Sequence, residues 1–391
     1  MYKKSDYYNR AYNFLHNKFF PGHKRLSTLA IFGTDLCDSA CKHCLIWTKR
    51  PVNYLPFEKI KEIMNSKAVG RNTTVALAGG EYLLHPDAVE IMGWFRDHHR
   101  NFDLLTNALQ PDLAIEAIKK HPPRRLYISL DGDKDSYLHM RGKDGYDGII
   151  KVIEALHKIV PISLMFTLSP YNDFKDLEHV AGVCKKYGTD LRVGVYNDIS
   201  FFDTIEDAHN YDIGSLKSPE IRSFSEAKKM IKSKPKVEAS LSNTSSSENL
   251  LINIRENLPE NLKEFSENYD FLVLYDEWRR GGLQLSCNSI LDSIVVLPNG
   301  DVPICQNLDV LIGNIHTNTL DEIINAEETR KQQKHYSENC NACWINFHRK
   351  YDIILYRSFE KYFGKAVTGK LLGYYWWEKD KKKSYKEMIR Q

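Results

Sequence analysis

The chain has 391 residues, of which 42% are hydrophobic and 27% charged, a composition typical of a folded globular protein. No apolar run reaches the length of a membrane span, and the charged start at residues 1–6 has no apolar segment behind it, so we expect neither a transmembrane helix nor a signal peptide and predict a cytoplasmic protein. The net charge of +3 conceals a basic tail, because residues 344–391 hold twelve Lys/Arg and five Asp/Glu.

From residue 27 to residue 198, short β-rich runs alternate with amphipathic helical patterns. Such alternation predicts a parallel α/β sheet. Six strand–helix units are too few for a closed eight-stranded barrel, so a partial barrel or an open sheet is expected. The expected strands are 29–32, 74–78, 102–106, 126–130, 162–167 and 191–195, and the expected helices are 57–65, 87–98, 112–119, 147–157 and 176–186.

The second half of the chain begins with a polar segment, 199–268, whose serine-rich stretch 240–247 resembles a linker. Short helices are expected at 225–232 and 250–258, and a longer one begins near residue 269 and passes through Trp278. The Pro-Asn-Gly-Asp sequence at 298–301 lies between two β-rich runs and predicts a hairpin from 294 to 304.

Seven of the eight cysteines fall in two groups, and their spacing favours metal ligation over disulfides in a cytoplasmic protein. The first group is Cys37, Cys41 and Cys44, directly after the first expected strand. Thiolates suit iron–sulfur clusters or zinc. Three ligands leave one iron of a four-iron cluster open to another molecule, whereas a zinc ion would need a further ligand such as His43.

The Cys-x3-Cys-x2-Cys spacing resembles the signature of the radical SAM (S-adenosylmethionine) superfamily, and the likeness extends from about residue 29 to 195. Gly79-Gly80-Glu81 follows the second strand, Thr106-Asn107 ends the third, Ser129-Leu130-Asp131-Gly132 ends the fourth, and Arg141-Gly142 comes later. All of these motifs follow the carboxyl ends of expected strands, the edge at which parallel barrels carry their active sites.

The resemblance implies a role for each matching residue. Cys37, Cys41 and Cys44 would hold a 4Fe–4S cluster whose open iron binds the amino and carboxylate groups of SAM. Gly79, Gly80 and Glu81 would line the methionine amino group, and Ser129 and Arg141 would face its carboxylate or the ribose. Weaker candidates for SAM contacts are Asn107, Asp131 and His43, the last standing where an aromatic residue often shields the cluster. Ala108 stands where relatives often have Gly, and Tyr82 where Pro is frequent.

The second group is Cys287, Cys305, Cys340 and Cys343, and four thiols form a closed site for a cluster or for zinc. Its surroundings resemble the SPASM/Twitch extension of radical SAM enzymes. Because full SPASM domains use about seven cysteines, four favour the shorter Twitch form with one auxiliary 4Fe–4S cluster. The resemblance implies a partial (β/α)6 TIM-like barrel followed by a small α+β Twitch-type iron–sulfur domain. The expected divisions are 1–26, a core at 27–198, a linker at 199–268, the auxiliary domain at 269–345 and a tail at 346–391.

The remaining polar residues have weaker assignments. Residues at the ends of the last two strands are expected near a substrate, and Asp198 could act as a general base or only as a helix cap. Cys184 could donate hydrogen to a radical, but its place late in a helix favours a structural thiol. The basic aromatic tail fits either an anionic or membrane-surface contact or a helix packed on the barrel, and no nucleic-acid motif is present. The residues expected near the substrate are Thr167, Ser169, Tyr196, Asn197 and Asp198.

The function implied by the resemblance is reductive cleavage of SAM to a 5′-deoxyadenosyl radical that abstracts hydrogen from a substrate C–H bond. An external donor such as flavodoxin or ferredoxin would supply the electron. A peptide or protein substrate is favoured, as in a maturase. The alternatives are a dehydrogenase or epimerase of a sugar, aminocyclitol or other small metabolite, and a non-catalytic metal-binding scaffold.

Overall fold

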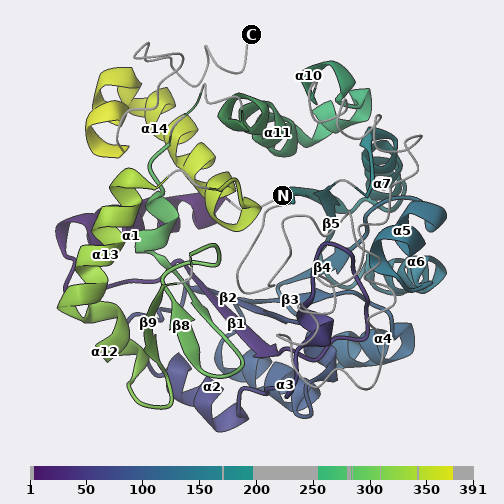
Figure 1. Cartoon of the computed structure of the whole chain (residues 1–391), viewed down its shortest axis with the longest axis horizontal. Helices are drawn as coiled ribbons and strands as arrows, with labels where there is room; N and C mark the ends of the chain where they lie inside the picture. Colours follow the sequence, from purple (N-terminus) through teal and green to yellow (C-terminus); the bar gives the residue numbers. More distant parts are fainter. Residues whose placement is uncertain are drawn as a thin grey trace, which may run out of the picture.

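The computed structural model describes residues 4–169, 171–196, 254–279, 283, 285–308, 310–340 and 343–372. A curved parallel sheet of seven strands, in the order β6-β5-β4-β3-β2-β1-β7, forms its centre (Figure 1). The expected partial barrel is confirmed, with one strand more than predicted. The strands are β1 (Thr28–Thr34), β2 (Thr74–Gly79), β3 (Phe102–Thr106), β4 (Arg125–Ser129), β5 (Ile162–Leu168), β6 (Asp190–Val195) and β7 (Ser293–Val296).

Helices cover the outer side of the curved sheet, and they begin and end where the sequence provides capping residues. In α7, for example, the Asp173 side chain accepts hydrogen bonds from the amides of Lys175 and Asp176, and Gly188 closes the helix in the left-handed conformation. These helices are α2 (Phe57–Met64), α3 (Ala88–His98), α4 (Pro111–Lys120), α5 (Lys134–Arg141), α6 (Tyr146–Leu156) and α7 (Phe174–Tyr187).

Strand side chains alternate between the helix layer and the interior of the half-barrel. On β1, Leu29 and Ile31 join the large core cluster, whereas Ala30 and Phe32 belong to a separate inner cluster with Ala78 and other residues. The inward positions hold several small residues, which leaves an internal cavity instead of a filled core.

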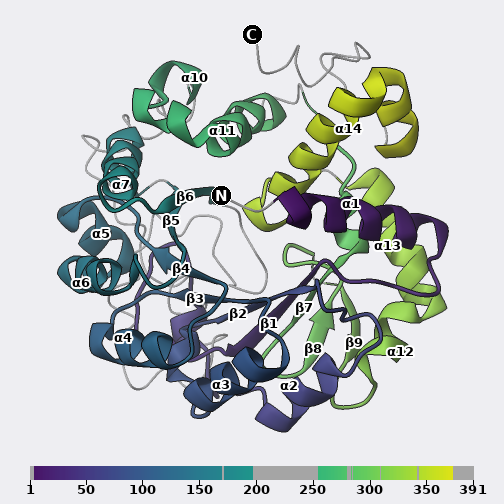
Figure 2. The same ribbon diagram turned by 180° about the vertical axis from the view of Figure 1, so that it is seen from behind.

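The C-terminal part closes the open side of the half-barrel. Figure 1 and Figure 2 show α11 and α14 across from the sheet, with α12, α13 and a small antiparallel pair of strands beside β1. Gly364 (φ +76°) interrupts α14 with a kink. These elements are α10 (Ile254–Asn257), α11 (Ser266–Arg279), β8 (Asp301–Pro303), β9 (Leu311–Asn314), α12 (Leu320–Asn325), α13 (Glu327–Asn339) and α14 (Asn346–Leu372).

The predicted hairpin from 294 to 304 is wrong in its strand pairing. The turn forms, with the Gly300 amide donating to the Leu297 carbonyl, but the strands on either side of it have different partners. β7 pairs in parallel with β1, Thr28 opposite Ser293, and β8 pairs with β9. All four residues of β7 are buried, so the strand gains more from the interior of the main sheet than an exposed hairpin would provide.

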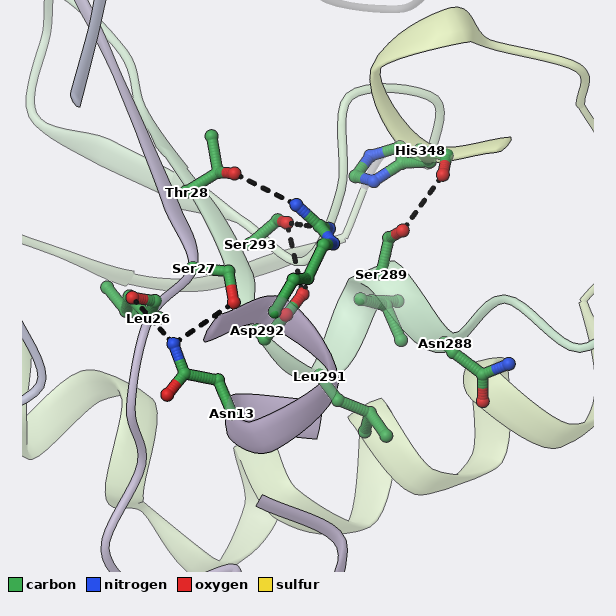
Figure 3. A network of polar contacts seen from close by, with 12 residues as sticks. Asn13, Leu26, Ser27, Thr28, Asn288, Ser289, Leu291, Asp292, Ser293 and His348 are labelled. Carbon is green, nitrogen blue, oxygen red and sulfur yellow. Dashed lines mark hydrogen bonds and ion pairs between the residues drawn. The ribbon is translucent and has the colours of Figure 1, made fainter. Parts of the chain in front are cut away.

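An N-terminal helix that the sequence did not predict, α1 (Lys4–Phe19), is fixed to the amino ends of β1 and β7. Arg10 donates to Thr28 (3.1 Å) and Ser293 (2.9 Å) and forms a buried ion pair with Asp292 (3.1 Å). Figure 3 shows part of this network, in which Asn13 donates to Ser27 (3.1 Å). The network buries one polar face of α1 against the barrel.

The predicted helix at 225–232 and the serine-rich stretch lie outside the described residues, whereas α10 falls within the helix predicted at 250–258. Within α14, Phe359 is buried, but Tyr362 and Phe363 are 65% and 58% exposed. Among the described residues, no helix is long and apolar enough to cross a membrane.

Candidate cluster site and cofactor cavity

The three cysteines of the first group lie in the loop that follows β1, at the carboxyl edge of the sheet. Cys37, Cys41 and Cys44 all line an internal cavity of about 340 Å³. Burial is the largest cause of a raised thiol pKa at Cys37 and at Cys44, where the value reaches about 12. A bare thiolate is therefore unfavourable here, and a bound cation would be needed to stabilise it.

The cysteine loop is fixed from one side by the end of α5. The Ala40 amide donates to the Arg141 carbonyl (3.0 Å), and the Lys42 amide donates to the Met140 carbonyl (2.9 Å). Gly142 ends the helix at φ +65°, and a Cβ atom there would lie 2.7 Å from the Ala40 carbonyl oxygen. Only glycine allows α5 and the cysteine loop to approach this closely.

Arg141 forms a buried ion pair with Asp131, which follows the end of β4. Its Nε donates to Asp131 Oδ2 (2.6 Å), and the other carboxylate oxygen accepts from the Thr167 amide (2.7 Å). Another guanidinium nitrogen lies 3.5 Å from Cys41 Sγ. Arg141 lines the cavity and Asp131 does not, so the carboxylate orients the guanidinium beside the thiol and balances its charge.

Gly79 and Gly80 line the cavity at the end of β2, as expected from the motif. A Cβ atom on Gly79 would lie 2.3 Å from the Thr34 carbonyl oxygen, and one on Gly80 the same distance from that of Leu36. These glycines therefore allow the loop after β2 to pack directly on the chain leading to the cysteines.

Glu81 is buried behind that surface and is absent from the residues lining the cavity. Its carboxylate accepts hydrogen bonds from the Thr106 hydroxyl (2.9 Å) and from the amides of Asn107 (2.6 Å) and Leu83 (3.1 Å). Burial raises its pKa to about 7. In this structure Glu81 joins the ends of β2 and β3, and its expected contact with a methionine amino group stays a prediction.

Asn107 and Ser129, at the ends of β3 and β4, both line the cavity. The Asn107 side chain donates to Asp38 (2.8 Å) and lies 3.8 Å from Cys37 Sγ. The next residue, Ala108, adopts φ +55°, the left-handed conformation that a glycine would adopt at no cost. The loop therefore keeps this shape despite the alanine.

His43 also lines the cavity, and its buried Nδ1 has no hydrogen-bond partner among the described residues. Burial, together with the nearby Arg141, lowers its pKa to about 3, so the ring is neutral. A neutral planar ring facing the cavity suits stacking better than ion pairing.

The second cysteine group is gathered beside the barrel. Cys287, Cys305 and Cys343 are buried and Cys340 is partly exposed. Burial is the main cause of the raised thiol pKa at Cys287, at Cys305 (to about 11) and at Cys343, with neighbouring cysteines of the group adding to each.

The buried Arg349 connects two sides of this second group. Its side chain donates to the carbonyls of Cys343 (3.1 Å) and Leu285 (3.0 Å) and lies 3.5 Å from Asp352.

Both cysteine groups fit iron–sulfur clusters by their donor chemistry. In the part of the chain that the structure describes, no three His, Cys, Asp or Glu side chains converge on the position of a single metal ion. A cluster does not need that convergence, because each thiolate binds a different iron atom. Three buried thiols facing a cavity suit a cluster with an open iron, and four gathered thiols suit a closed one.

The cavity extends from the first group to residues close to the second group, which the sequence did not predict. Its walls include residues next to the second group, from directly after Cys305 and from the start of α14. The sequence showed these positions only as neighbours of cysteines, with no pattern that pointed inward. These residues are Gln306, Ile345, Asn346, Phe347 and Tyr351.

The remaining candidates lie in different surroundings. Thr167 and Tyr196 line the cavity. Ser169 does not, and its hydroxyl instead donates to the Asn172 side chain and accepts from the Tyr171 amide within its own turn. Asn197 and Asp198 lie outside the described residues. Cys184 is fully buried and donates to the Asp190 carbonyl (3.4 Å), which agrees with a structural thiol.

Comparison with known families gives two matches. Residues 31–183 match the radical SAM superfamily, and residues 287–344 match SPASM, an iron–sulfur cluster-binding domain. The two matched segments contain all seven grouped cysteines.

Two similar curated proteins overlap with part of the chain. One is the mycofactocin maturase MftC of Mycolicibacterium smegmatis, 26% identical over 168 residues, or 41% of this chain and 42% of the relative. The other is the AdoMet-dependent heme synthase of Methanosarcina barkeri, 28% identical over 143 residues, or 35% of this chain and 41% of the relative. The aligned region is thus less than half the length of either relative.

Among solved structures, Streptococcus suis SuiB bound to its precursor peptide SuiA has a TM-score of 0.54 at 14% sequence identity. The superposition covers 87% of this chain and 74% of SuiB. This likeness shows a shared fold.

Proposed function

This chain carries a radical SAM domain and a SPASM iron–sulfur domain, and we propose that it uses them to cleave SAM reductively and abstract hydrogen from a C–H bond of a peptide or protein substrate. One observation carries the proposal. The three thiols, the Gly79-Gly80 turn, Ser129 and Arg141 come from separate segments, and all of them line one cavity.

The clusters and SAM, when bound, would supply electron transfer and a 5′-deoxyadenosyl radical, and the protein would hold the clusters, SAM and the substrate in place. Cys37, Cys41 and Cys44 would hold the first cluster at the mouth of the half-barrel. Arg141 offers a fixed guanidinium beside Cys41, because Asp131 orients it, and a fixed cation suits the carboxylate of SAM.

The inner walls of the cavity are largely apolar. Ala30, Ala78 and Phe32 project from the strands, and Phe347 closes the cavity from α14. Apolar walls exclude water, which protects a reactive radical from side reactions.

The second cluster would be held by Cys287, Cys305, Cys340 and Cys343, and four ligands favour a single closed cluster there. Its neighbours Gln306 and Asn346 line the same cavity, so it would lie within reach of a bound substrate as an electron acceptor. An external flavodoxin or ferredoxin would reduce the first cluster.

A peptide substrate is supported by the relative MftC, a mycofactocin maturase, and by SuiB, which was solved bound to a precursor peptide. The cavity volume of about 340 Å³ favours a second candidate, because it lies within the range of small-molecule sites. A dehydrogenase or epimerase acting on a small metabolite is therefore the alternative.

The test is 5′-deoxyadenosine formation by anaerobically reconstituted protein with SAM and dithionite. Extract of the source organism, separated by size, is added to search for the substrate. Stimulation by the peptide and protein fraction supports a maturase, and stimulation by the small-molecule fraction alone supports the alternative. Absence of SAM cleavage under strong reduction would point to the non-catalytic scaffold.

A further inference from the structure

A second hollow, of about 650 Å³, lies at the opposite edge of the sheet from the cysteines. It is bounded by α1, by the loops that precede β1 and β2, and by α12. None of its lining residues lines the cofactor cavity. We call it the α1 groove; it is lined by Asn9, Asn13, His16, His23, Lys24, Arg25, Leu26, Lys67, Ala68, Gly70, Arg71, Asn72, Thr73, Asp321 and Asn325.

Exposed cations dominate the α1 groove. Arg25, Lys67 and Arg71 are exposed, and none of them forms an ion pair with another described residue. Asp321 is the one carboxylate among the described residues that line the groove, and it already accepts from the Ser66 hydroxyl (2.8 Å) and the Lys67 amide (3.0 Å). The positive charges of Arg25, Lys67 and Arg71 can therefore attract an anionic ligand.

A row of aromatic rings borders the same groove along the exposed face of α1. Tyr8, Tyr12 and Phe20 are 66%, 54% and 60% exposed, and His16 lies between the last two, with ring centroids 6.1 Å from Tyr12 and 5.4 Å from Phe20. Tyr8, Tyr12 and His16 are four residues apart and so share one side of α1, and Phe20 follows directly after the helix. The Arg25 guanidinium, 5.6 Å from the Tyr12 ring, joins this row to the groove.

The helix presents these rings on a rigid support. Its opposite side is buried. Arg10 donates a hydrogen bond to Asp292, Asn13 donates to Ser27, and Asn17 donates to the Arg25 carbonyl; Figure 3 shows the Asn13 contact. Exposed aromatic side chains on a fixed helix are typical of a recognition surface, because binding there costs little further ordering.

We propose that the α1 groove binds an acidic segment of the peptide substrate, with carboxylates near Arg25, Lys67 and Arg71 and apolar side chains on the aromatic row. The inference rests on the proposed peptide substrate and adds the chemistry by which that peptide is recognised. It also places recognition away from the reacting cavity, so the modified residue and the recognised segment are different parts of the substrate.

A peptide fits better than a nucleic acid. On the side of α12 and α13 the positive surface ends at the exposed acids Glu322, Glu327 and Glu328. Nucleic-acid binding uses a continuous basic stripe along a phosphate backbone, whereas a short acidic segment needs only a few cations beside apolar contacts.

The test is fluorescence anisotropy with the full, anaerobically reconstituted chain. The probes are a labelled peptide of glutamate and leucine, the same peptide with lysine for glutamate, and labelled single-stranded DNA. We expect the glutamate peptide to bind most tightly. The double variant Lys67→Glu/Arg71→Glu should weaken it at least tenfold, about 1.4 kcal/mol, and Tyr12→Ala should also weaken it. Lys120→Glu/Lys158→Glu, which reverses two charges on exposed lysines outside the groove, is the matched control and should leave binding unchanged.

Equal binding of the two peptides, tighter binding of DNA, or equal effects of the groove and control variants would overturn the proposal. The assay needs no turnover, and SAM cleavage by the same preparation is measured separately. Failure of the proposed function would appear as absent SAM cleavage, whereas failure of this inference would appear in the peptide-binding measurements.

Discussion

Gly142 offers a direct test of how the cysteine loop is held. Substitution with alanine has two costs. The left-handed φ of +65° is unfavourable for any residue with a Cβ atom, by about 1–2 kcal/mol. The new Cβ atom would also lie 2.7 Å from the Ala40 carbonyl oxygen, so the loop must move.

The chain contains a matched control for the first cost. Gly188 ends α7 at φ +63°, and a Cβ atom there would have no atom of a described residue within 4 Å. Gly188→Ala should therefore lower the free energy of unfolding by about 1–2 kcal/mol only. Gly142→Ala should cost roughly 1–2 kcal/mol more, because moving the loop weakens the hydrogen bonds from the Ala40 and Lys42 amides.

Urea unfolding of both variants under anaerobic conditions measures the difference, and iron content after reconstitution measures the site. We expect Gly142→Ala to bind less iron than Gly188→Ala, because its cysteine loop is displaced. Equal losses of stability together with equal iron content would refute the argument that this contact positions the cysteines.

Three other substitutions test the buried charges. Asp131→Asn should lower the free energy of unfolding by about 3–5 kcal/mol, because it leaves Arg141 buried and unpaired. A double-mutant cycle with Arg141→Met should show strong coupling between the two residues, and additive losses of stability would contradict the buried ion pair. Burial raises the pKa of Glu81 in the folded state from 4.5 to about 7. Its contribution to stability is therefore full below pH 4.5 and is lost as the pH rises through about 7. Glu81→Gln should flatten the pH dependence of the urea midpoint between these two pH values. Arg349→Met should cost about 3–5 kcal/mol, since it leaves Asp352 buried without its cation, and adding Asp352→Asn should restore part of that loss in urea unfolding.

The sequence predicted the six strands of the core because their signals are local. Buried strands alternate with amphipathic helices at short intervals, and each motif of the candidate site follows directly on a strand. The cavity wall formed by Gly79, Gly80, Asn107, Ser129 and Arg141 could therefore be anticipated from the chain.

The pairing of the two strands beside the turn at 298–301 could not be predicted from the local sequence. Pro298 to Asp301 has the residues of a tight turn, and the turn is present, but pairing is decided by distant strands. The parallel partner of β7 is β1, near the other end of the chain, and no short-range pattern indicates such a contact.

The hydrogen-bond partners of the site's side chains could not be predicted from the sequence either. The motif placed Glu81 at the end of β2, but it did not show that Thr106 and two backbone amides occupy the carboxylate. The contribution of Phe347 and Tyr351 to the cavity likewise depends on how α14 packs against the open side of the barrel.

The most direct test of the proposed chemistry is formation of 5′-deoxyadenosine by wild-type protein, Cys41→Ala and Cys184→Ala under the same anaerobic, reducing conditions. Cys41 faces the cavity beside Arg141, whereas Cys184 is a buried thiol in the helix layer, so the pair compares a cluster ligand with a structural cysteine. We predict that wild type and Cys184→Ala cleave SAM and that Cys41→Ala does not. Cleavage retained in Cys41→Ala, or absent from the wild type with its iron restored, would contradict the assignment of this cavity to SAM.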